Sequence, residues 1–163
     1  MKLKAIVASR DLGLTEDVVS QVAATFATTD GDFAVRASTS GVPSSVIEAF
    51  VVDLGIALDR RVIKFKPHGQ LPAVGRAGTF NRDYTMVSCS SHVLAFFDTD
   101  RGMEGGTGHV VKAALDRGIE VEAYVAAPDG RLEYLGSDDS DPDRVPMISN
   151  PVLEQMWREV REE

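Results

Sequence analysis

Five short apolar runs alternate with helical patterns along the first 126 residues, and this alternation constrains the fold more than any other feature of the sequence. The apolar runs lie at residues 2–8, 32–38, 60–66, 92–98 and 119–126. The helical patterns lie at residues 15–28, 43–59, 79–89 and 108–118. Strands that alternate with helices are typical of a mostly parallel sheet with helices on both faces, connected by right-handed crossovers. The sequence therefore predicts an α/β, Rossmann-like, three-layer fold with a sheet of about five strands.

Local signals predict several ends of these elements. Thr15 is placed to cap the first helix. The second helix is expected to begin at Pro43, because proline is favoured in a first helical turn. Gly118 is expected to follow the last of the four helices as its left-handed C′ residue. A turn at 128–130 leads into residues 131–136, which we interpret as a candidate antiparallel edge strand.

The C-terminal part of the chain differs from the rest in composition. We expect residues 1–136 to form one domain, and residues 137–163 to form an acidic linker and an amphipathic helix. That helix is predicted over 150–163, with Asn150 as its cap and Pro151 at its first position. Its apolar stripe consists of Val152, Leu153, Met156, Trp157 and Val160. The stripe needs a partner surface, either its own sheet or a second subunit, and we expect a homo-oligomer, most simply a dimer.

Charge and composition disfavour several classes of protein. The 163 residues carry a net charge of −8 and a pI near 4.9, so duplex nucleic acid is a poor partner, because such binding relies on Lys and Arg to neutralise phosphates. No apolar run approaches the roughly 18 residues of a membrane span, and we expect a cytoplasmic protein without a membrane partner. The single cysteine, Cys89, excludes an intrachain disulfide and is expected to be a small core residue. Three scattered histidines predict no metal site, and we expect no cofactor.

The segment between the fourth apolar run and the helix that follows is longer than a chain reversal needs. A strand-to-helix connection usually takes about two to six residues, whereas this one takes about ten. Its glycines are Gly102, Gly105, Gly106 and Gly108. If the strand order is 3-2-1-4-5, this loop faces the loop after the first strand, which carries Ser9 and Arg10. Such sheets bind ligands at the carboxyl ends of the strands where the order reverses, so a ligand crevice is predicted here.

The start of the helix after this loop is a candidate anion site. The N–H groups of a first helical turn have no intrahelical acceptor, and the helix dipole favours negative charge beside them. Glycine lets these amides approach an anion closely, and Thr107 is expected to cap the helix. We predict that a phosphate-like anion binds where the two loops meet, at Ser9, Arg10, Gly105, Gly106, Thr107, Gly108 and His109.

Short motifs along residues 3–125 are similar in order and spacing to those of a known superfamily. They are Ser9-Arg10, Arg82-Asp83-x-x-Met86, Ala95-Phe96, Gly106-Thr107-x-His109 and Gly118-Ile119-Glu120-Val121. In these motifs the chain resembles the SLOG superfamily, which unites the LOG phosphoribohydrolases and the Smf/DprA proteins, and within it the branch related to YspA and YpsA. The resemblance implies a Rossmann-like fold that binds a nucleotide or nucleotide-derived ligand at the glycine loop. It also implies that subunits pair through helices beside the site.

The departures from that pattern concern the second strand and catalysis. Where the family has a glycine-rich turn, this chain has residues 38–45, in which Ser38 and Thr39 are candidate ligand donors. The LOG enzymes place a glutamate in the glycine motif, and that position falls here on Lys112. N-glycoside cleavage needs a carboxylate to stabilise the transition state or to activate water. The candidates for a rearranged catalytic site are Arg82, Asp98 and Glu104.

Two classes of function remain open from the sequence. The favoured one is a protein that binds a small anionic, nucleotide-like ligand as a sensor or sequestering module, without turnover. The alternative is a nucleoside 5′-monophosphate N-glycosidase of the LOG kind. A single-strand binder of the DprA kind is disfavoured, because the chain is acidic and lacks interleaved basic and aromatic residues.

Overall fold

The computed structural model describes residues 3–67, 76–98, 105–127 and 129–137. The strands are β1 (Leu3–Ala8), β2 (Asp32–Arg36), β3 (Val62–Phe65), β4 (Ser90–Phe97), β5 (Glu120–Ala126) and β6 (Leu132–Ser137). The helices are α1 (Glu16–Thr28), α2 (Val46–Ala57), α3 (Arg76–Ser88) and α4 (Gly106–Asp116). The predicted helix at 150–163 lies outside the described residues, so it stays a prediction.

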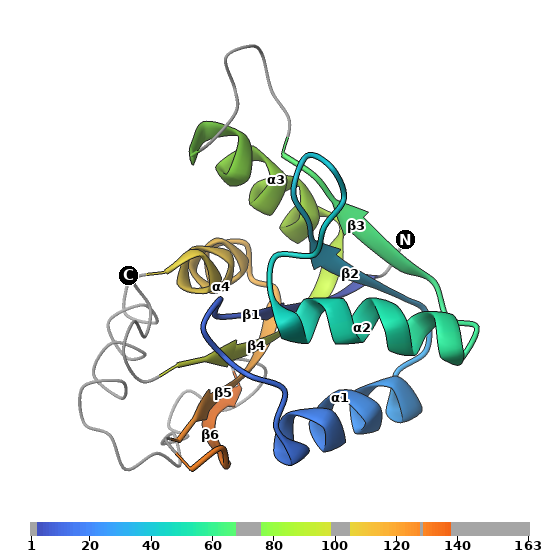
Figure 1. The fold of residues 1–163 in the computed structure, drawn as a ribbon. Coiled ribbons are helices and arrows are strands. Elements are labelled where there is room, and N and C mark those ends of the chain that lie inside the picture. Colours follow the sequence, from blue (N-terminus) through green and yellow to red (C-terminus); the bar gives the residue numbers. More distant parts are fainter. Residues whose placement is uncertain (1–2, 68–75, 99–104, 128, 138–163) are drawn as a thin grey trace.

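The six strands form one sheet in the order β3-β2-β1-β4-β5-β6 (Figure 1). The first five are parallel, and β6 pairs antiparallel with β5. The α/β, Rossmann-like fold, the 3-2-1-4-5 order and the antiparallel edge strand are all confirmed. The order reverses between β1 and β4, which are neighbours in the middle of the sheet. The loops that follow these two strands therefore leave the same edge of the sheet side by side.

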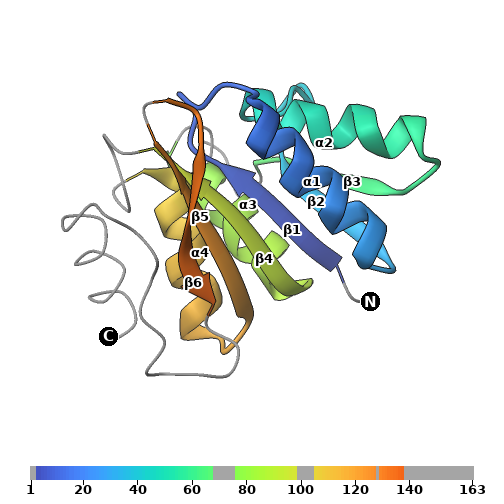
Figure 2. The same cartoon turned by 90° about the horizontal axis from the view of Figure 1, so that it is seen from below.

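The helices cover both faces of the sheet, as Figure 2 shows. Residues of α3 and α4, including Met86 and Val110, pack with Ala5 and Val7 of β1 on one face. Residues of α1 and α2 pack with Ile6 and Ala8 of the same strand on the other face. Because β1 is buried on both sides, it reads as a continuous apolar run rather than as an alternating one.

Three helix starts differ in how well the sequence predicted them. Thr15 caps α1, since its Oγ1 accepts a hydrogen bond from the Val18 N–H at 3.4 Å. The start of α2 at Pro43 is wrong: the backbone of Pro43 forms an isolated bridge with Ala37, and the helix begins at Val46, capped by Ser45. Helix α3 begins at residue 76 rather than 79.

Two further expectations concern the far ends of helices. Gly118 follows α4 with a φ of 69°, which confirms the left-handed C′ residue. Cys89 is exposed at the end of α3, so its placement in the core is wrong. The buried positions at this end of α3 belong to Met86 and Val87, three and two residues earlier. No helix among the described residues is long and apolar enough to cross a membrane.

Gly55 lies where α2 packs closely against β3. A Cβ at this position would lie 2.5 Å from Cγ2 of Val62 and 3.0 Å from the Arg60 carbonyl oxygen. Replacing Gly55 with alanine is therefore expected to lower the free energy of unfolding by about 1 to 3 kcal/mol through overpacking, despite the better helix propensity of alanine. Urea unfolding measures it, with Gly13→Ala as the control, because a Cβ at Gly13 meets nothing within 4 Å. Equal stabilities would contradict the close packing.

Candidate functional site

A cavity of about 180 Å³ opens at the carboxyl edge of the sheet, between the end of β1 and the start of α4. We call it the β1–α4 cavity. It is lined by Ala8, Ser9, Arg10, Arg36, Ser44, Arg82, Asp83, Gly105, Gly106 and Thr107. It is smaller than the roughly 300 to 1,000 Å³ of sites that enclose a drug-sized ligand. The cavity lies where the strand order reverses, as the topology predicted.

The loops after β1 and β4 are joined directly. The backbone N–H of Ser9 donates to the Phe96 carbonyl oxygen at 2.9 Å, which extends the β1–β4 pairing by one residue. The Ser9 hydroxyl in turn accepts from the backbone N–H of Asp98 at 3.3 Å. The expectation that these two loops face one crevice is confirmed. Ser9 is buried by these contacts, whereas Arg10 is exposed at the mouth of the cavity.

Helix α4 begins at the cavity without a side-chain cap. Its N-cap residue is Gly105, and the bond from His109 N–H to the Gly105 carbonyl at 3.2 Å closes the first turn. Thr107 is not the cap that the sequence predicted, because it lies inside the helix with its side chain buried. The N–H groups of Gly106, Thr107 and Gly108 therefore have no intrahelical acceptor. By contrast, α1 and α2 are capped by side chains.

Arg36, the last residue of β2, places a buried guanidinium against this helix start. Its Nη2 donates to the Ala8 carbonyl oxygen at 2.8 Å and to Oγ1 of Thr107 at 3.1 Å. Its Nη1 lies on the side of Gly106, at 3.2 Å from where a Cβ of that residue would be. No described residue accepts a hydrogen bond from Nη1. Arg36 is only 5% exposed and lines the cavity, so this nitrogen is a donor at the cavity wall.

Glu48 of α2 holds the Arg36 side chain in this orientation. Its two carboxylate oxygens accept from Nη2 of Arg36 at 2.7 Å and from Nε at 3.3 Å. They also accept from the backbone N–H groups of Arg36 at 2.8 Å and Ala8 at 3.3 Å, and from the Ser45 hydroxyl at 3.2 Å. Burial by itself lowers the pKa of Arg36, but the neighbouring carboxylates of Glu48 and Asp83 together raise it by more, so the pKa is raised. The guanidinium therefore stays charged.

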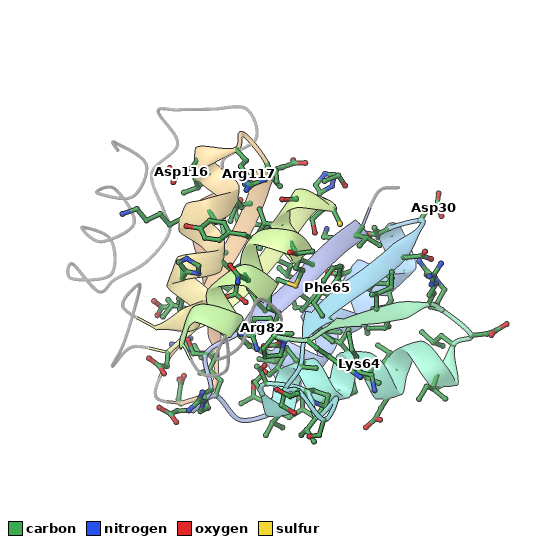
Figure 3. The ribbon with its side chains drawn as sticks, turned by 90° about the horizontal axis from the view of Figure 1, so that it is seen from above. Asp30, Lys64, Phe65, Arg82, Asp116 and Arg117 are labelled. Atoms are coloured by element: carbon green, nitrogen blue, oxygen red, sulfur yellow. The ribbon has the colours of Figure 1, made fainter. Side chains whose placement is uncertain are left out.

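Arg82 of α3, labelled in Figure 3, also lines the cavity. Its Nε pairs with Oδ1 of Asp83 at 2.9 Å, and its Nη1 donates to the Ala37 carbonyl at 3.2 Å. The other oxygen of Asp83 lies 3.4 Å from Nδ1 of His109, whose ring meets the Tyr84 ring edge-on. Arg82 thus shapes the cavity while its charge is largely balanced.

The predicted site residues divide into two groups. The cavity brings together Ser9, Arg10, Arg82, Gly105, Gly106 and Thr107. Ser38 and Thr39 do not line it: they are exposed in the turn after β2, where the Ser38 hydroxyl accepts from the Val42 N–H. Asp98, Gly108 and His109 are not among the residues that line it, and Glu104 falls outside the described residues.

Two charged residues that organise the site, Arg36 and Glu48, were not among the residues predicted from the sequence. Each had a detectable signal, because each is a single charge inside an apolar segment: Arg36 ends the strand DFAVR, and Glu48 lies in the helix VIEAFVV. A buried charge requires an opposite charge nearby, and these two have opposite signs. Their pairing across 12 residues could therefore have been proposed from the sequence.

The fold and the cavity define an α/β domain with Rossmann-like layering and a cavity at its switch point. Comparison of the chain with protein-family models, with curated proteins and with solved structures gives no match. The likeness to the SLOG superfamily accordingly stays an interpretation of the motifs. Within the part of the chain that the structure describes, no group of three His, Cys, Asp or Glu side chains is placed to hold a metal ion.

Proposed function

We propose that this protein binds a small anionic, nucleotide-like ligand through a phosphate group held in the β1–α4 cavity. The observation that carries the proposal is Nη1 of Arg36, a charged donor without an acceptor among the described residues, which lies beside the uncapped start of α4 at that cavity. A bound oxyanion accepts charge-assisted hydrogen bonds from such a donor, and these are stronger than bonds between neutral groups. An oxyanion bound there would satisfy this nitrogen.

The hydrogen-bond donors at this wall of the cavity are suited to an oxyanion. The amides of Gly106 and Thr107 lack intrahelical acceptors, and the positive end of the α4 dipole adds to their attraction for negative charge. Arg36 adds a charge-assisted donor, and Arg10 stands at the mouth. Helix starts joined with an arginine are a common arrangement for holding phosphate.

The nucleotide-like character of the ligand rests on position and size. Sheets of this topology hold nucleotides at the switch point, which is where the cavity lies. The cavity of about 180 Å³ suits a phosphate and its adjoining sugar, with a base lying outside the mouth. The motifs shared with the SLOG superfamily point to the same class of ligand.

Binding without turnover is favoured over N-glycoside cleavage. Among the described residues that line the cavity, Asp83 is the one carboxylate. Its two oxygens are engaged by Arg82 and His109. A carboxylate held in this way is poorly placed to activate water or to stabilise an oxocarbenium-like transition state. A sensor or sequestering role is therefore the function that we propose.

The test of this function begins with the small molecules that copurify with the protein. Mass spectrometry of the supernatant after denaturation is expected to release a phosphate-containing compound in proportion to protein. Incubation of the protein with a panel of nucleoside monophosphates is expected to yield no free base. Release of base above a no-protein control would replace the binding function with the enzymatic one. Absence of binding to any phosphate compound in a titration would contradict both.

Gly106 gives a local test of the anion site. In Gly106→Ala the new Cβ lies 3.2 Å from Nη1 of Arg36, in the space where the anion would bridge the two. We expect a folded protein whose affinity for the copurified compound falls about tenfold, as when one charge-assisted hydrogen bond is lost. Calorimetric titration measures it. Gly13→Ala is the matched control, because a Cβ there meets nothing within 4 Å. Equal affinities of the two variants would place the ligand elsewhere.

A further inference from the structure

We propose that two copies of this chain form a two-fold dimer, in which the outer sides of their α2 helices pack against each other in antiparallel orientation. The proposal concerns a surface other than the β1–α4 cavity, and it does not depend on the proposed function. It rests on the apolar side chains that α2 exposes and on the charges near the two ends of this helix.

Helix α2 is apolar on its outer side as well as on the side that packs in the core. Of its two charged residues, Glu48 is buried and only Asp53 is exposed. On the outer side Val46 is 54% exposed and Ile56 is 77% exposed. A surface helix usually carries polar residues opposite its core-facing stripe, and a helix that is apolar all round is typically buried on all sides.

Exposed apolar side chains gather at this one helix. The larger ones among the described residues are Leu14, Val42, Val46, Ile56, Leu58 and Tyr84. Four of these six lie in α2 or within four residues of its ends. The described parts of α1 and α4 expose none of them, and Figure 1 shows α2 on the outside of the molecule. Apolar side chains gathered on one exposed face mark a site of protein–protein contact.

The charges near the two ends of α2 favour a second copy of this chain as the partner. Before the helix, the ammonium nitrogens of Lys64 and Lys66 each lie 3.8 Å from where a Cβ of Gly41 would be. In its second half and just after it lie the exposed carboxylates of Asp53 and Asp59. None of these four side chains is in an ion pair with another described residue. In an antiparallel pair the basic end of one α2 meets the acidic end of the other, so the surface is complementary to itself.

The spacing along α2 gives the register of the pair. Val46 and Ile56 are ten residues apart in the helix, or about 15 Å. When the two-fold axis passes at the level of residue 51, Val46 of each copy lies opposite Ile56 of the other. Asp53 of each copy then lies opposite Ala49 of the other, so the two Asp53 carboxylates do not face each other.

The mass of the whole protein in solution tests the dimer. Analytical ultracentrifugation at micromolar concentration is expected to give twice the 17.6 kDa of one chain. In Ile56→Glu the dissociation constant is expected to rise about 100-fold or more, because a charge enters an apolar contact twice in a two-fold interface. The fold is expected to persist, since Ile56 is largely exposed, and circular dichroism checks it. A wild-type protein of 17.6 kDa, or a folded Ile56→Glu protein that remains dimeric, overturns the proposal.

Tyr84→Glu is the matched control, because Tyr84 is an exposed apolar side chain on another helix, α3. The SLOG resemblance implies that subunits pair through helices beside the site, and α3 lines the cavity with Arg82. We expect the dissociation constant of Tyr84→Glu to stay within about twofold of the wild-type value. If Tyr84→Glu separates the two copies while Ile56→Glu does not, the copies pair through α3 and the proposal is wrong.

Cross-linking tests the antiparallel orientation. The background is Cys89→Ser, which removes the only native thiol. A mixture of the Val46→Cys and Ile56→Cys proteins is expected to form covalent dimers with a short bismaleimide. Neither protein is expected to do so alone, because the two copies of each new thiol would lie about 15 Å apart along the helices. Cross-linking of each protein with itself would show a parallel pair, and it would overturn the proposed dimer.

Discussion

Replacing Glu48 with alanine is expected to lower the free energy of unfolding by about 3 to 5 kcal/mol, because the Arg36 guanidinium would remain buried without its counter-ion. Glu48 is fully buried and joins the ends of β1 and β2 to the start of α2. Its removal also leaves the backbone N–H groups of Ala8 and Arg36 without their acceptor.

Urea unfolding followed by circular dichroism at neutral pH measures this loss. The control is Asp53→Ala, which removes an exposed carboxylate from the same helix and is expected to change stability by no more than about 0.5 kcal/mol. If Glu48→Ala lowers the free energy of unfolding by less than about 1 kcal/mol, Arg36 reaches solvent or another carboxylate. The Arg36–Glu48 pair would then not organise the site.

The second large effect is on binding and not on stability. The double variant Arg36→Met with Glu48→Gln removes both charges of the pair, and such paired replacement of a buried ion pair is often nearly neutral for folding. The glutamine keeps an acceptor for one of the two backbone N–H groups, because Ala8 N–H donates to Oε1 of Glu48 and Arg36 N–H donates to Oε2. We expect a folded protein whose affinity for ribose 5-phosphate is about 2 kcal/mol weaker, roughly 30-fold, because the charge-assisted donor of Arg36 is gone.

A matched control for the double variant exists in the turn before β6. Arg131 and Asp129 form an exposed ion pair at 3.0 Å, and Arg131→Met with Asp129→Asn removes the same two charges away from the cavity. NMR titration of both double variants compares them under identical conditions. The control is expected to bind as wild type does. Binding retained by the Arg36→Met, Glu48→Gln protein would show that the anion is held without Arg36.

The layering of the fold could be predicted from the sequence because its signals are local. The five apolar runs have strand length, the patterns between them have helical period, and right-handed crossovers leave few ways to arrange them. The capping of α1 by Thr15 and the turn of the chain at Gly118 were predicted for the same reason. The start of α2 was wrong because Pro43, although suited to a first helical turn, is held by a contact with Ala37.

The candidate site was only half predictable, since half of it depends on tertiary contacts. The glycine loop and Ser9-Arg10 could be predicted from their composition and from their place after a strand. The role of Arg36 appears only when β2 lies beside β1 and its side chain reaches Thr107, 71 residues away. The same contact explains why Thr107 is not a cap: its hydroxyl accepts from Arg36 inside the helix. The role of Arg36 and the place of Thr107 both depend on the direction of their side chains, which the spacing of strands along the sequence does not give.

We have proposed that an oxyanion binds between the start of α4 and Arg36. A crystal structure of the protein with ribose 5-phosphate at about pH 5.5, where monoanion and dianion are both present, tests it most directly. We predict phosphate density in the β1–α4 cavity, within hydrogen-bond distance of the Gly106 and Thr107 N–H groups and of Nη1 of Arg36. Phosphate density at another arginine, with this cavity filled only by water, would contradict it.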